Sequence, residues 1–158
     1  TTWRGSGRPC GGWRRRLALG FGATCLITAP LIYFLWPVMV RDGVDLAELV
    51  ERWHLGGTAA VLFGLYSITV HPVLEESFWR GVLPDRLAGD LLFAGFHLLV
   101  LAPLVHAAWL PLVFGVLASA AWIWRWMART FGGLAVPVVT HALADLGVVL
   151  AVWARVGG

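Results

Sequence analysis

Residues 55–80 read LGGTAAVLFGLYSITVHPVLEESFWR. The first twenty, Leu55 to Leu74, contain no Asp, Glu, Lys or Arg, which is typical of a helix that crosses a lipid bilayer. Glu75, Glu76 and Arg80 then place ionisable groups at or near membrane depth. Because such groups are costly there, they usually lie at functional sites with partners nearby. The stretch therefore predicts a membrane helix that carries part of a site.

The composition extends this interpretation to the whole chain of 158 residues. Hydrophobic residues make up 59% and charged residues only 13%, and the mean hydropathy is +0.77. A soluble domain of this size would need far more polar surface. The ten Trp and eight Phe are typical of a protein anchored at the bilayer interfaces. We therefore expect an all-α integral membrane protein with one domain.

Five apolar segments are long enough to cross a hydrocarbon core of about 30 Å, which takes about 20 residues. Residues 41–54 have apolar positions at helical spacing, which predicts a short amphipathic helix on the membrane surface. Pro30 and Pro37 are expected to bend the first segment or to end it early. The expected organisation is a polytopic bundle: a flexible basic arm over 1–16, a first transmembrane helix over 17–40, an amphipathic linker over 41–54, and a four-helix catalytic core over 55–158 with spans at 55–78, 91–109, 111–128 and 132–154.

The charge asymmetry of the chain predicts its orientation. All basic residues are Arg, and five of the twelve lie in the first 16 positions. The basic arm, the loop 80–90 and the turn 125–129 are expected on the cytoplasmic side, where Arg is enriched, and the acidic segment 41–54 on the other. We expect the N-terminus inside, the C-terminus outside, and the bacterial inner membrane as the location. The arm is interpreted as a topology signal, so no nucleic acid is expected as a partner.

Three polar residues fall at one depth in the predicted bundle. Glu75 lies five residues before Arg80 at the basic end of its helix, His97 about six residues into the next helix, and His141 about nine into the last. At 1.5 Å per residue, all three lie about 8–14 Å inside the basic face. Three separate helices that carry costly groups at one depth indicate a shared site rather than packing alone.

Helical phase assigns roles to the two adjacent glutamates. Glu76 and Arg80 have the i, i+4 spacing of an ion pair, so we expect a mainly structural role for Glu76. Neighbouring helical residues point about 100° apart, so both glutamates are not expected to face one small cavity directly. Glu75 is left to face the site. His71, one turn earlier, is expected to hydrogen-bond to Glu75.

The third and fifth apolar segments each carry a pair at i, i+4: Phe93 with His97, and His141 with Asp145. Asp145 is expected to accept a hydrogen bond from one ring nitrogen of His141, which fixes the tautomer and leaves the other nitrogen aimed into the site. Small residues nearby, such as Gly147, allow the helices to approach closely.

These residues also resemble those of a known family. The chain is similar to the CAAX protease and bacteriocin-processing family of intramembrane endopeptidases, relatives of the CaaX prenyl-protein endopeptidases, through three motifs in the same order: Glu75-Glu76-x-x-x-Arg80, Phe93-x-x-x-His97 and His141-x-x-x-Asp145. The resemblance extends over residues 55–152.

The resemblance implies a role for each of these residues. Glu75 and His97 would activate a water for peptide-bond hydrolysis, and His141 with Asp145 would hold that water or the developing oxyanion. An ionised Asp145 cannot donate a hydrogen bond, which favours an orienting role for it. The residues expected to support this site are Glu76, Arg80, His71 and Phe93.

The preferred mechanism uses no cofactor, but a zinc-dependent version of the same protease is an alternative. A carboxylate and two imidazoles can bind Zn²⁺ and leave one position open for water. The ligands would then be Glu75, His97 and His141.

Two other classes of function use the same residues. One is a non-catalytic bacteriocin-immunity or membrane binding protein that keeps the motifs, and the other is a small proton or metal transporter with a Glu/His relay. For a protease, the expected partners are the lipid bilayer and a bacterial membrane protein or peptide with a C-terminal anchor to be trimmed. The sequence indicates no oligomeric state.

Overall fold

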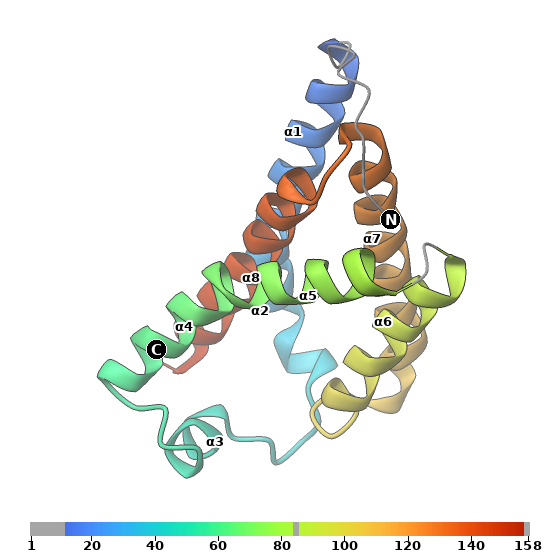
Figure 1. Ribbon diagram of the computed structural model, residues 1–158. Coiled ribbons are helices and arrows are strands. Elements are labelled where there is room, and N and C mark those ends of the chain that lie inside the picture. The colour runs from blue at the N-terminus through green and yellow to red at the C-terminus, as the bar shows by residue number, and fades with distance from the viewer. Residues whose placement is uncertain (1–11, 84–85, 157–158) are drawn as a thin grey trace.

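Helices form the architecture of the protein. The computed structural model describes residues 12–83 and 86–156, and this part of the chain contains no β-strand. The all-α class is therefore confirmed. Figure 1 shows the elements, which in chain order are α1 Gly12–Leu26, α2 Thr28–Met39, α3 Leu46–Arg52, α4 Thr58–Thr69, α5 His71–Glu76, the π-helix η1 Ser77–Val82, α6 Leu87–Leu101, the short 3₁₀ helix η2 Ala107–Trp109, α7 Leu110–Phe131 and α8 Ala135–Val156.

Most of the expected membrane spans are long helical stretches. Within the described residues, four stretches are long and apolar enough to cross a membrane: Gly12–Met39, Thr58–Val82, Ala107–Phe131 and Ala135–Val156. α6 is apolar but has only 15 residues, a length of about 22 Å against a hydrocarbon core of about 30 Å. The helical membrane bundle is confirmed, with α6 as a shorter fifth helix.

The first span begins earlier and breaks at a different residue from those expected. α1 starts at Gly12, so residues 12–16 of the basic arm are helical, and the rest of the arm lies outside the described residues. The helix breaks at Ile27, and Pro30 follows in the first turn of α2. A proline in a first turn removes no intrahelical hydrogen bond. The break therefore precedes the proline.

Pro37 lies inside α2 and leaves a carbonyl without its helical donor. The carbonyl of Tyr33, four residues earlier, accepts instead from the guanidinium of Arg155 near the end of α8. The same guanidinium lies 4.2 Å from the centroid of the Tyr33 ring. This contact joins α2 to α8 at the end of the bundle where α3 lies in Figure 1.

The predicted surface helix is α3, within residues 41–54. Asp45 caps it by accepting from the backbone N–H groups of Ala47 at 2.8 Å and Glu48 at 3.2 Å. Leu46 and Leu49 are half-buried, whereas Glu48 is exposed. α3 is therefore amphipathic, as the spacing predicts.

α8 is the helix around which the others gather. It packs against α1, α2, α4, α5 and α7. Gly147 lies where α8 meets the break between α1 and α2, and a Cβ there would collide with the Thr28 hydroxyl and lie tightly against the Ala29 nitrogen and the Cys25 carbonyl. Glycine therefore permits this close approach between helices.

α6 and α7 form the other side of the bundle and pack closely against each other. Phe93 from α6 packs with Ala121, Trp124 and Met127 from α7 in a buried cluster. Figure 1 shows α5 crossing from α8 toward α7 and α6, and η1 continues the same helical stretch and contacts α6. The end of α5 therefore lies between the two halves of the bundle.

Candidate active site

Glu75 lies at the end of α5 with three histidines around its carboxylate. Its Oε1 is 3.5 Å from Nε2 of His71, and its Oε2 is 3.7 Å from Nε2 of His97 and 3.8 Å from Nε2 of His141. The structure thus brings together Glu75, His97 and His141, which were predicted to lie at one depth in the membrane. Oε2 is buried and makes no hydrogen bond to any described residue, although two imidazole nitrogens face it.

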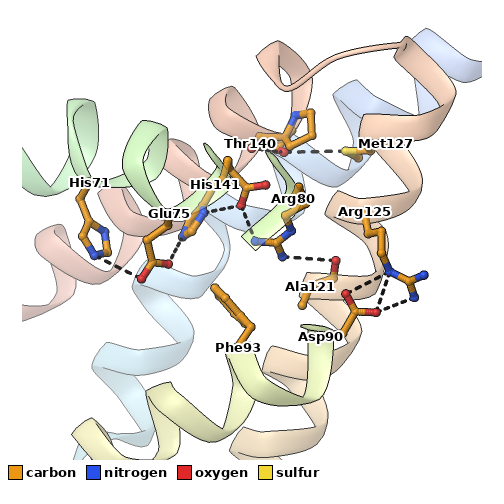
Figure 2. A network of polar contacts seen from close by, with 12 residues as sticks. His71, Glu75, Arg80, Asp90, Phe93, Ala121, Arg125, Met127, Thr140 and His141 are labelled. Carbon is orange, nitrogen blue, oxygen red and sulfur yellow. Dashed lines mark hydrogen bonds and ion pairs between the residues drawn. The ribbon is translucent and has the colours of Figure 1, made fainter. Parts of the chain in front are cut away.

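His141 is held at its other nitrogen by Glu76. Nδ1 of His141 lies 2.8 Å from Oε1 of Glu76, and both side chains are buried. Figure 2 shows the ring of His141 facing Glu75. The ring also stacks on Trp124, with centroids 4.2 Å apart and planes 15° from parallel. These contacts fix the imidazole so that Nε2 faces Glu75.

The hydrogen bond expected between Asp145 and His141 is not formed in the structure. Asp145 Oδ1 is 3.7 Å from Nε2 of His141, beyond hydrogen-bond distance, and its Oδ2 lies 3.4 Å from Nδ1 of His71. The i, i+4 spacing places Asp145 on the same stripe as His141 and nearest its Nε2, whereas Nδ1 is bonded to Glu76. Glu76 takes the orienting position that was expected for Asp145.

Glu76 also pairs with Arg80, as its spacing predicts. The Arg80 guanidinium donates to Glu76 Oε1 at 2.9 Å and to the Ala121 carbonyl at 3.3 Å, and it lies 5.0 Å from the ring of Phe93. Arg80 is within the π-helix η1, a conformation that is frequent at functional sites. Glu76 therefore links a buried arginine to His141, which is more than the mainly structural role expected from the sequence.

His97 on α6 is oriented by its own helix. Its Nδ1 lies 2.9 Å from the Phe93 carbonyl, and because a carbonyl only accepts, Nδ1 carries the proton. The ring also packs on Phe93, with centroids 4.2 Å apart. In the neutral imidazole, Nε2 is then an acceptor directed at Glu75.

Two features of the site were missed from the sequence. One is Trp124, whose stacking on His141 has no signal in the spacing of the apolar residues.

The other is an ion pair between α6 and α7: Arg125 Nε lies 2.9 Å and its terminal nitrogen 2.5 Å from Oδ2 of Asp90. The sequence put Asp90 in a loop and Arg125 in a turn, whereas they lie within α6 and α7. The spacing of Asp90, Phe93 and His97 puts them on one face of a helix, and this could have indicated that Asp90 is helical.

Zinc dependence stays an alternative prediction. Among the described residues, no group of three or more His, Cys, Asp or Glu side chains is arranged so that it could hold a metal ion. Nε2 of His97 and Nε2 of His141 lie 3.7 and 3.8 Å from Glu75 Oε2, so these three side chains would be the ligands if the protease binds zinc.

Comparison with known proteins supports one family. The family described as type II CAAX prenyl endopeptidase Rce1-like matches residues 57–147, which is more than half of the 158-residue chain. The match includes all of the residues around Glu75 described above. Neither the curated proteins nor the solved structures give a significant match. The matched family supports a protease, and four apolar helical stretches within the described residues support an integral membrane protein. The chain belongs to the Rce1-like family of type II CAAX prenyl endopeptidases.

Proposed function

We propose that the protein is an intramembrane endopeptidase in which Glu75 activates a water molecule for peptide-bond hydrolysis. The observation that carries the proposal is Glu75 Oε2, a buried carboxylate oxygen that faces the Nε2 atoms of His97 and His141 without a hydrogen bond to either. A water bound between these atoms has Glu75 Oε2 to accept its proton and two imidazoles to hold it in place.

The proposed reaction proceeds in two steps. Glu75 Oε2 takes a proton from the water as the oxygen attacks the scissile carbonyl carbon, with His97 Nε2 as a second acceptor that orients the water. The tetrahedral intermediate then collapses, the C–N bond breaks, and Glu75 returns the proton to the leaving amine. The products are a carboxylic acid and an amine, so the atoms of one water are accounted for.

His141 is proposed to stabilise the oxyanion. Its Nδ1 faces the Glu76 carboxylate, and in the proposal its Nε2 donates a hydrogen bond to the developing oxyanion. The Arg80 guanidinium balances the charge of Glu76 from the other side. This reaction uses only the side chains of the chain. Zinc dependence is tested by assaying enzyme prepared with chelator, and activity that returns only with Zn²⁺ contradicts the metal-free proposal.

The proposed substrate is a membrane-associated peptide or protein cut near its C-terminus. The family to which the chain belongs suggests a prenylated CaaX end, whereas the chain's all-Arg, Ala- and Gly-rich composition suggests a bacterial substrate without a prenyl group. Purified protein in liposomes is assayed with a farnesylated CaaX peptide and with the same peptide lacking the farnesyl group. Cleavage of one and not the other assigns the substrate class.

The proposal is tested by Glu75→Gln in that assay. The amide keeps the shape but removes the base, so kcat is expected to fall by about 10²–10⁴-fold. Glu51→Gln on the exposed face of α3 is the matched control and is expected to cleave like wild type. Normal turnover by Glu75→Gln overturns the assignment. No cleavage of either peptide by wild type favours the non-catalytic binding or immunity function instead.

The orientation in the membrane is also a proposal. Arginines near the predicted basic face favour a cytoplasmic site, with the N-terminus inside and the C-terminus outside. In a chain with Cys10 and Cys25 replaced, single cysteines at positions 5 and 157 are labelled in intact cells. Labelling at 157 and not at 5 supports this orientation, and the reverse contradicts it.

A further inference from the structure

His71 lies between two carboxylates that come from different helices. Its Nε2 is 3.5 Å from Oε1 of Glu75 on α5, and its Nδ1 is 3.4 Å from Oδ2 of Asp145 on α8 (Figure 2 shows the contact with Glu75). An imidazolium has one N–H for each of the two carboxylates. The side chain of His71 is 37% exposed, so the bridge lies at the open edge of the site.

His71 also lies near two aromatic rings. Tyr66 from α4 has its centroid 6.2 Å away, and His141 from α8 has its centroid 6.4 Å away. Within the described residues, the short polar contacts of the His71 side chain are those with Glu75 and Asp145. His71 differs in this respect from His97, whose Nδ1 is satisfied by the backbone of its own helix.

The two oxygens of Glu75 consequently have different surroundings. Oε1 faces His71, and Oε2 faces the nitrogens of His97 and His141. We propose that His71 and Asp145 act as positioning residues: Asp145 holds His71, and His71 holds Oε1 so that Oε2 is presented to the water. This inference rests on the proposed function, in which Glu75 is the base.

The contacts of Asp145 favour an action through His71 over a direct action on His141 or the oxyanion. Its hydrogen bond goes to His71, whereas its separation from His141 is 3.7 Å. If Asp145 acts through His71, removing Asp145 has an effect only while His71 is present. If Asp145 instead contacts His141 or the oxyanion, its effect is independent of His71. A double-mutant cycle separates these two cases.

The experiment measures kcat and KM for His71→Ala, Asp145→Ala and the double variant in the liposome assay. Each single variant is expected to lose about 10–100-fold in kcat with little change in KM, which is typical of losing the group that orients a functional ligand. The double variant is expected to lose no more than the worse single variant. Asp145→Asn, which keeps an acceptor for His71, is expected to recover most of the kcat lost in Asp145→Ala.

His106→Ala is the matched control, because His106 lies on the connection before η2, away from the site. Near-UV circular dichroism of each variant establishes that it is folded. Single losses that multiply in the double variant, or single variants with wild-type kcat, overturn the inference. These outcomes leave the proposed function intact as long as Glu75→Gln is inactive. Retained activity in Glu75→Gln overturns the proposed function itself.

Discussion

Two ion pairs in this protein have the same residues at the same spacing and very different surroundings. Glu76 and Arg80 lie in the middle of the bundle with side chains 0% and 3% exposed, whereas Glu48 and Arg52 lie on α3 with side chains 62% and 64% exposed. The exposed pair has the shorter N–O distance, 2.5 Å against 2.9 Å. The N–O distance alone therefore says little about what each pair contributes to stability.

The difference lies in what surrounds each pair. Removing one partner of a buried pair leaves an uncompensated charge in a low-dielectric region, and this is strongly destabilising. An exposed pair exchanges its partner for water and is screened by salt. The buried pair also reaches His141 through Glu76, so a change there is expected to affect both folding and catalysis. A change in the exposed pair is expected to have little effect on folding and none on catalysis.

The largest effect is expected from Arg80→Met. Methionine keeps much of the volume but leaves Glu76 buried without its cation, so the free energy of unfolding should fall by about 3–5 kcal/mol. Unfolding in mixed detergent micelles, followed by circular dichroism, measures it. A loss below about 1 kcal/mol, the range of exposed pairs, would show that the two pairs are equivalent.

A smaller effect on stability is expected from Glu76→Gln. The amide can still accept from Arg80 or from His141, but it loses the charge, so the expected loss of unfolding free energy is about 1–3 kcal/mol. Because the ring of His141 loses its charged partner, kcat should fall by about 10–100-fold. The same micelle unfolding and liposome assays apply. Wild-type kcat in a folded Glu76→Gln protein would confine Glu76 to the structural role expected from the sequence.

The smallest effect is expected from Arg52→Ala on α3. Loss of the exposed pair should change the free energy of unfolding by less than about 1 kcal/mol, and raising the salt concentration should shrink the difference further. Cleavage should be unchanged. A loss comparable to that of Arg80→Met would mean that α3 is anchored through this pair, and the comparison between the two regions would fail.

Much of the fold follows from the sequence because apolar length and local spacing are readable there. The uncharged stretch before Glu75 predicted a membrane helix, and the i, i+4 spacing predicted the contact of Glu76 with Arg80. The common depth of Glu75, His97 and His141 predicted their convergence because rise per residue is nearly constant in helices. Each of these predictions depends only on spacing within one helix or on depth below the membrane face, and neither requires knowing how two helices pack.

The partner of His141 could not be predicted in the same way. Helical phase separates Glu75 and Glu76 by about 100°, but an imidazole has nitrogens on two sides, so both glutamates reach the same ring from different directions. Choosing between Glu76 and Asp145 required the packing of α5 against α8. The pairing of Asp90 with Arg125 likewise depends on how α6 meets α7, which sequence spacing does not specify.

The most direct test of the central claim is an experimental structure with a phosphinate peptide, whose tetrahedral phosphorus resembles the intermediate of peptide hydrolysis. The account predicts one phosphinate oxygen within about 2.6–3.2 Å of Glu75 Oε2 and another within the same distance of Nε2 of His141. A phosphinate bound elsewhere, with Glu75, His97 and His141 still facing one another, would contradict the claim that these three residues are the site of hydrolysis.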